Sequence, residues 1–279
     1  MDKVTWTDIS GFDIEKIALS GQCFRLNRHP TKENSWELMA YGRYLRIEKS
    51  PDDNSLDFFC TQQEFDDIWQ KYFDLETDYQ YYIDKIDTND MYLTAAAEAG
   101  RGTKILRQEL WEVMVSFIIS QNNNIPRIKR SIEALCRTSG EAHPLEAGRI
   151  WYQFPEPQKL TQMENLEPAA LGYRAEYIKS LAEKITAGEI SLSYLMNEEI
   201  SDEAIRSYLE SIYGIGPKVA NCIMLFGLHR IDSFPRDKWI NAVIREKYNG
   251  NFPLDKYKGF AGIIQQYLFD YAIRNKNSL

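Results

Sequence analysis

The sequence lacks the long apolar runs of a membrane protein. Among its 279 residues the longest such runs are short, as at 113–115 and 117–119, and polar residues interrupt them. No stretch approaches the ~20 consecutive apolar residues of a membrane-spanning helix, and the opening MDKVTWTDISG shows no apolar signal core. We therefore expect an intracellular protein without a signal peptide, in the cytoplasm or nucleoid if the source is prokaryotic.

Clustered cysteine and histidine are also missing. Cys23, Cys60, Cys136 and Cys222 are scattered, and the three histidines form no ligand pair. Scattered cysteines are typical of free thiols in a reducing compartment, and the pattern gives no reason to expect a metal or another cofactor.

Positive charge is scarce on average but unevenly distributed. The chain has 33 Lys+Arg against 41 Asp+Glu, a net charge of -8 that argues against a nucleic-acid partner. The net charge is -10 over residues 1–100, +4 over 101–140, -7 over 141–210 and +5 over 211–279. Two basic segments therefore lie within an acidic chain, and both contain the motifs described below.

The pattern changes from mixed to helical near residue 100. Aromatic and aliphatic residues alternate with polar ones on either side of Gly42, which predicts a β-hairpin over 36–48. Apolar residues at helical spacing from Leu106 to Phe117 predict a deeply buried helix, and the last helix is predicted over 255–273. We expect a mixed β/α domain over 1–100 and a helical domain over 101–279.

Residues 201–228 predict a helix, a tight turn and a second helix. Gly214 and Gly216 permit unusual backbone angles in the turn, and Pro217 opens the second helix. The unpaired amides and positive end of that helix stabilise an anion such as a DNA phosphate. On local evidence alone, an ordinary helix pair with a glycine turn fits equally well.

Lys218 lies in the first turn of this second helix, with Cys222 one turn further on. The positive helix end disfavours a second positive charge, which favours the neutral amine of nucleophilic lysine chemistry. Asp237 follows after 19 residues, where Pro235 precedes a new helix. A solvated lysine and an ordinary capping aspartate are the alternative interpretations.

The turn, Lys218 and Asp237 together resemble the helix-hairpin-helix DNA glycosylase superfamily, in which a lysine at this position marks members that also nick the backbone. Four more segments resemble the 8-oxoguanine DNA glycosylase branch, in the same order and spanning nearly the whole chain. They are 20–25 (SGQCFR), 116–127 (SFIISQNNNIPR), 171–175 (LGYRA) and 261–269 (AGIIQQYLF).

The resemblance implies an α+β fold, in which an N-terminal antiparallel β-containing domain packs on a mainly α-helical helix-hairpin-helix glycosylase core. It implies a monomeric base-excision repair enzyme that binds double-stranded DNA containing 8-oxoguanine. Such an enzyme flips the lesion out of the duplex and removes it, preferably opposite cytosine, with associated β-elimination at the abasic site. We expect a local basic cleft to bind the DNA while acidic surfaces face away.

The resemblance also assigns roles in catalysis and in the base pocket. Lys218 is the expected nucleophile, and Asp237 stabilises the developing positive charge. Four residues form the expected pocket: the Gly21 carbonyl accepts the N7–H found only on the oxidised base, Gln265 reads the Watson–Crick edge, and Cys222 and Phe269 sandwich the base. The alternative interpretations are that Gln265 is an ordinary surface glutamine and that Phe269 belongs to the hydrophobic core.

Further residues match positions that fill the gap, contact the orphaned cytosine or bind the backbone. Since both arginines are present, we predict a preference for cytosine opposite the lesion. These residues are Asn122, Arg127, Tyr173, Arg174, Gly214, Gly216 and Lys238.

Two positions depart from the family pattern. Trp239 stands where many relatives have a phosphate-contacting histidine, and Asn221 replaces a common acidic residue. Two other functions stay open: a lysine-bearing glycosylase for a different oxidised base, and a non-enzymatic helix-hairpin-helix DNA-binding protein.

Overall fold

The computed structural model describes residues 2–50, 55–163 and 169–275. Its main sheet is antiparallel, with strand order β1-β5-β4-β3-β2, and β6 pairs with β7 in a separate hairpin. The strands are β1 (Val4–Trp6), β2 (Leu26–Arg28), β3 (Ser35–Ala40), β4 (Arg43–Lys49), β5 (Leu56–Phe58), β6 (Ala142–Pro144) and β7 (Ile150–Tyr152).

Helices make up most of the remainder. A π-helical turn, Phe65–Trp69, joins α2 to α3, and short 3₁₀ turns occupy Glu146–Gly148 and Leu254–Tyr257. The helices are α1 (Ile14–Leu19), α2 (Gln62–Glu64), α3 (Gln70–Tyr72), α4 (Gln80–Ile83), α5 (Met91–Gly100), α6 (Leu110–Ile119), α7 (Ile125–Ser139), α8 (Pro157–Thr161), α9 (Arg174–Thr186), α10 (Leu192–Leu195), α11 (Asp202–Glu210), α12 (Pro217–Phe226), α13 (Lys238–Lys247) and α14 (Ala261–Arg274).

The predicted hairpin around Gly42 is confirmed as β3 and β4. Tyr41 and Gly42 both have positive φ, at 51° and 66°, as a two-residue turn between twisted strands requires. Every residue of β3 is buried, because the sheet packs on both faces. On one side, Glu37 of β3 pairs with Arg149 at the start of β7.

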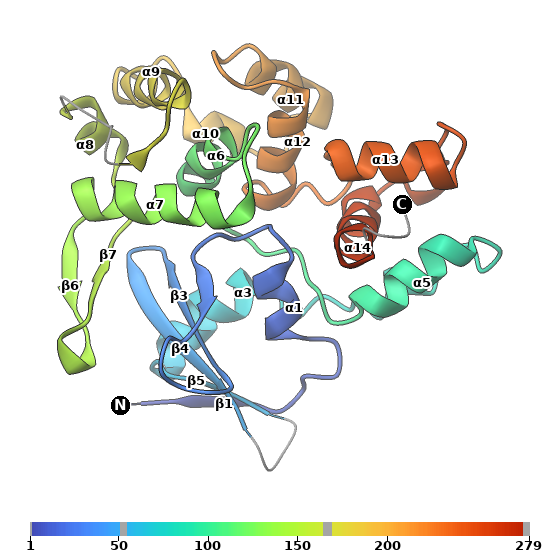
Figure 1. Cartoon of the computed structure of the whole chain (residues 1–279), viewed down its shortest axis with the longest axis horizontal. Coiled ribbons are helices and arrows are strands. Elements are labelled where there is room, and N and C mark those ends of the chain that lie inside the picture. Colours follow the sequence, from blue (N-terminus) through green and yellow to red (C-terminus); the bar gives the residue numbers. More distant parts are fainter. Residues whose placement is uncertain (1, 51–54, 164–168, 276–279) are drawn as a thin grey trace.

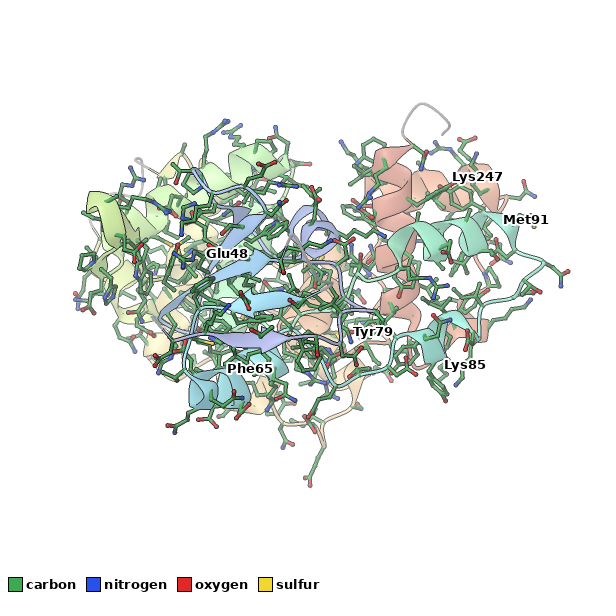
Figure 2. The ribbon with its side chains drawn as sticks, turned by 90° about the horizontal axis from the view of Figure 1, so that it is seen from below. Glu48, Phe65, Tyr79, Lys85, Met91 and Lys247 are labelled. Carbon is green, nitrogen blue, oxygen red and sulfur yellow. The ribbon has the colours of Figure 1, made fainter. Side chains whose placement is uncertain are left out.

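Most of the helices lie on one side of the sheet and extend away from it (Figure 1). Helix α7 lies between the sheet and helices α8 and α9 (Figure 1), while α5, α13 and α14 form a neighbouring lobe in which α14 contacts the other two. Figure 2 shows Met91 of α5 and Lys247 of α13 in this lobe, apart from Glu48 of the sheet. The Lys247 Nζ lies 5.6 Å from the ring centroid of Tyr92, so a side chain of α13 reaches α5.

Two hydrophobic cores correspond to the expected α+β arrangement. One joins the sheet to α1 and α3, and the other joins α5 to α6 and the helices that follow it. Phe24, Tyr79 and Ile86 precede residue 100 yet belong to the helical core, whereas Leu106 belongs to the sheet's core. Helix α5 precedes residue 100 yet packs on α14, so the boundary at 100 stays a prediction.

Two predicted helix boundaries are wrong. The buried helix begins at Leu110 rather than Leu106, because tertiary hydrogen bonds hold the preceding segment extended. The last helix begins at Ala261, since a 3₁₀ turn at Leu254–Tyr257 and Gly259, with φ of 95°, interrupt the predicted span.

Across the described ranges, no helix combines the length and apolar character needed to cross a bilayer.

Candidate active site and DNA-binding surface

A cavity of about 420 Å³ brings together segments from both ends of the chain. The loop after α1 forms one wall, the N-termini of α7, α12 and α13 form others, and α14 closes the back. The predicted catalytic and pocket residues all line this cavity: Gly21, Lys218, Cys222, Asp237, Gln265 and Phe269.

Lys218 reaches the cavity from the first turn of α12. It is half-buried, its Nζ donates to the Ser120 hydroxyl at 3.4 Å, and the ammonium lies 5.2 Å from the ring centroid of Phe117. Burial raises the pKa of the Cys222 thiol, and the neighbouring Lys218 offsets this only in part. The thiol is therefore a neutral wall of the cavity, not a competing nucleophile.

Asp237 is fixed at the mouth of the same cavity. It caps α13, and its Oδ1 accepts hydrogen bonds from the amides of Trp239 and Ile240, both at 2.9 Å. The predicted helix start is thus confirmed, and the positive end of the helix favours a negative charge there. A carboxylate held by two backbone donors can stabilise a cation near Lys218 without moving.

The Gly21 backbone is locked from both sides. Its φ of 76° suits glycine, and a Cβ there would lie 3.4 Å from the Phe269 ring. Gln266 Nε2 donates to the preceding Ser20 carbonyl at 3.0 Å, and Gln22 Oε1 accepts from the Leu106 amide. The sequence pattern does not single out Gln266, because its contact lies 246 residues away.

Gln265 presents an unused acceptor to a ligand. Its side chain is 4% exposed, and its Oε1 has no hydrogen-bond partner within the described residues. An unpaired polar atom in a buried site is costly unless a ligand satisfies it. The Watson–Crick edge of a guanine carries N–H donors that can do so.

Three predicted DNA contacts are exposed beside the cavity. Asn122 has a φ of 46° in the loop between α6 and α7, Arg127 lies in the first turn of α7, and Tyr173 is 50% exposed before α9. Asn124, rather than Asn123, caps α7 by accepting from the Arg127 amide. These side chains are accessible to a duplex lying over the cavity mouth.

Arg174 differs from these three because it is buried, at 5% exposure. Its guanidinium donates to the carbonyls of Leu171, Gln121 and Asn122. It also lies 4.5 Å from the ring centroid of Tyr173. In this state Arg174 shapes the loop that carries Asn122, and its contact with cytosine stays a prediction.

The two glycines of the hairpin turn have different surroundings. Gly214 has a φ of 88°, and a Cβ there would lie 2.4 Å from Cγ of Tyr177, so the ring requires glycine. A Cβ at Gly216 would meet nothing within 4 Å. Gly216 therefore leaves open space before the amides of α12, where a phosphate can approach.

Lys238 and Trp239 adjoin Asp237 at the cavity. Lys238 is exposed, and its Nζ lies 5.3 Å from the ring centroid of Trp239. The indole packs partly against the helical core. No group of three or more potential metal ligands occurs among the residues that the structure describes.

Comparison with known proteins places this site in a family. Residues 6–114 match the model of the 8-oxoguanine DNA glycosylase N-terminal domain, and residues 115–256 match that of the HhH-GPD superfamily base excision DNA repair proteins. The chain therefore belongs to the HhH-GPD superfamily. Its N-terminal domain and its relatives place it in the 8-oxoguanine DNA glycosylase branch, as the sequence resemblance indicated.

The relatives are similar over most of their length. An N-glycosylase/DNA lyase of Saccharomyces cerevisiae is 28% identical over 84% of this chain and 68% of its own. The Clostridium acetobutylicum 8-oxoguanine glycosylase/lyase is 31% identical, with a TM-score of 0.89. It was solved with DNA containing cytosine opposite 8-oxoG, and the match covers 99% of this chain and 96% of that one. MBOgg1, solved with a low-affinity DNA ligand, is 37% identical with a TM-score of 0.89, and the match covers 98% of this chain and 96% of MBOgg1.

Proposed function

We propose that this chain removes 8-oxoguanine lying opposite cytosine in duplex DNA, with Lys218 as the nucleophile. The chain is a bifunctional DNA glycosylase and abasic-site lyase of the 8-oxoguanine branch. The observation that supports the lysine mechanism is the convergence of Lys218, Asp237 and the unpaired Gln265 Oε1 on one cavity.

The chemistry follows from the two groups at the cavity mouth. The Lys218 Nζ gives up a proton and bonds to C1′ of the flipped nucleotide while the C1′–N9 bond breaks, and the base leaves with the bonding electrons and takes up that proton. Asp237 stabilises the positive charge that develops on the sugar. The amine adduct opens to an iminium ion, loss of a C2′ proton follows, and the C3′–O3′ bond breaks with the 3′ phosphate leaving.

Recognition rests on the carbonyl of Gly21, a residue whose two chain neighbours, Ser20 and Gln22, are held by hydrogen bonds. That oxygen can accept the N7–H of 8-oxoguanine, whereas N7 of guanine is itself an acceptor and would face it without a proton. A site built for a hydrogen bond rejects an analogue that cannot make it. Phe269, which contacts Gly21, and the neutral Cys222 supply apolar faces for the base.

A borohydride trapping assay tests the lysine mechanism. Wild-type protein is expected to form a covalent adduct with a duplex containing one 8-oxoguanine opposite cytosine, and Lys218→Gln is expected to form none. Lys179→Gln, which changes an exposed lysine of α9, is the matched control and should trap normally. An adduct that persists in Lys218→Gln, or base release without any adduct, would refute the assignment.

The opposite base is tested separately. Arg127 is exposed with its donors accessible, so Arg127→Gln is expected to reduce the preference for cytosine, each good bidentate contact being worth about 1–3 kcal/mol of discrimination. Single-turnover excision opposite each of the four bases measures this. Equal wild-type rates opposite all four would overturn the proposed preference.

A glycosylase for another oxidised base is the remaining alternative. It would trap with other lesions in the same duplex and not with 8-oxoguanine. The Gly21 carbonyl in this cavity favours 8-oxoguanine, because an acceptor there selects for a donor at N7.

A further inference from the structure

Three segments face the DNA in the proposed function, and contacts within the protein join them to one another. They are the loop 120–124 that carries Asn122, the start of α9 with Tyr173, and the hairpin turn 213–216. Gln121 lies where all three meet. Its side-chain Nε2 donates to the Gly214 carbonyl at 2.9 Å, and its own carbonyl accepts from Arg174 of α9.

An aromatic contact joins two of the same segments. Tyr177 of α9 lies edge-on to Tyr173, with centroids 5.7 Å apart, and to Tyr213 of the turn, at 4.8 Å. It also occupies the space that a side chain at residue 214 would need. The hairpin turn is thus held to α9 by ring packing and to the loop by the Gln121 amide.

We propose that Gln121 and Tyr177 are positioning residues that hold Asn122 and Tyr173 at a fixed offset from the hairpin turn. When the turn binds a phosphate, the gap-filling side chains are then already aligned with the base pair to be opened. Neither residue needs to touch the DNA. This inference rests on the proposed function, since it assigns to these residues the alignment of groups that the proposal places on DNA.

The loop requires such a restraint because its conformation is unfavourable on its own. Asn122 has a φ of 46° and is exposed, so its own side chain packs little. Its carbonyl and that of Gln121 are held by Arg174, and the Gln121 side chain fixes this unit to the hairpin turn through the Gly214 carbonyl. Removing the Gln121 donor would let the loop move relative to the turn while the turn stays intact.

Gln121→Met tests the polar contact, because methionine has a similar length and no donor. Single-turnover excision of 8-oxoguanine opposite cytosine is expected to slow about tenfold, the effect of losing roughly one hydrogen bond. Binding to undamaged DNA is expected to change less than twofold. Gln158→Met, at an exposed position of α8, is the matched control and should leave both unchanged.

A second substrate separates positioning from a general structural defect. Opposite an abasic-site analogue, 8-oxoguanine has no pair to break and no orphaned base to hold, so the Gln121→Met defect should shrink to less than threefold. Tyr177→Leu should behave like Gln121→Met, and Tyr177→Phe, which keeps the ring, should retain wild-type rates. Equal slowing on both substrates, or wild-type rates in Gln121→Met and Tyr177→Leu, would overturn the inference.

Borohydride trapping of the same variants keeps this result distinct from the proposed function. If wild-type protein forms no adduct, the lysine mechanism fails. If wild-type, Gln121→Met and Tyr177→Leu all form the adduct and all excise at the same rate, only the positioning inference fails.

Discussion

Substituting Gln266 tests whether the recognition loop is held from behind by α14. Gln266→Met preserves side-chain length but removes the Nε2 donor to the Ser20 carbonyl. Both residues are almost fully buried at the wall of the cavity. An unpaired buried carbonyl costs about 1–3 kcal/mol, and we expect the free energy of unfolding to fall by that amount.

The same substitution should also impair excision. Gly21 follows Ser20 directly, so freeing the Ser20 carbonyl lets the Gly21 carbonyl move from the position that an N7–H must meet. A misplaced or lost hydrogen bond of about 1.4 kcal/mol slows the chemical step about tenfold. Urea unfolding measures the first effect, and single-turnover excision at a temperature where the variant is folded measures the second.

The adjacent Gln265 provides the matched control. Its Oε1 is already unpaired, so Gln265→Met should lower the excision rate while leaving the unfolding midpoint nearly unchanged. A Gln266→Met protein that is as stable and as active as wild type would show that the Ser20 contact does not hold the loop. Similar destabilisation by both substitutions would contradict the distinction drawn between a paired and an unpaired amide.

Three other substitutions separate backbone, phosphate and charge effects. Gly214→Ala should cost more than about 2 kcal/mol in the free energy of unfolding, from positive φ and the clash with Tyr177. Gly216→Ala should fold normally but bind duplex DNA more weakly in a salt titration, because its methyl group occupies open space before the α12 amides. The buried Asp74 accepts from Arg107 Nε at 3.0 Å and from the Tyr79 hydroxyl at 2.9 Å, so Asp74→Asn should lose stability by about 3 kcal/mol at pH 7, as breaking an ion pair with a buried partner does. Burial raises the pKa of Asp74, but hydrogen bonds and charges from His229, Arg107 and Tyr79 outweigh burial and hold the pKa well below 3.8. The stability that Asp74 contributes is therefore present above about pH 4 and is lost as the pH falls further. Urea midpoints of wild type and Asp74→Asn should therefore converge in acid, and a constant difference down to pH 2 would refute this assignment.

Local sequence signals predicted the features that neighbouring residues determine. The hairpin around Gly42 and the Asp237 cap of α13 each depend on residues within one turn. Such signals act through steric limits on φ and through short side-chain to backbone hydrogen bonds. For this reason the start of α13, which fixes Asp237, could be placed from the sequence.

Long-range contacts decided the features that the sequence did not predict. The segment before Leu110 has helical spacing, but Gln22 binds the Leu106 amide and Tyr72 binds the Arg107 amide, which holds the backbone extended. Helix α14 is buried on nearly every side from Ala261 to Leu268, so periodicity could not distinguish Gln266 from its neighbours.

Arg174 shows where a family resemblance and a physical environment give different information. The resemblance assigns its donors to a cytosine, whereas the structure assigns them to three backbone carbonyls. Both can hold only if DNA binding draws some donors away from the loop, and the carbonyl of Asn122, at 3.2 Å, is the longest of these contacts. Reading of the opposite base would then be coupled to the position of Asn122, because the same guanidinium serves both.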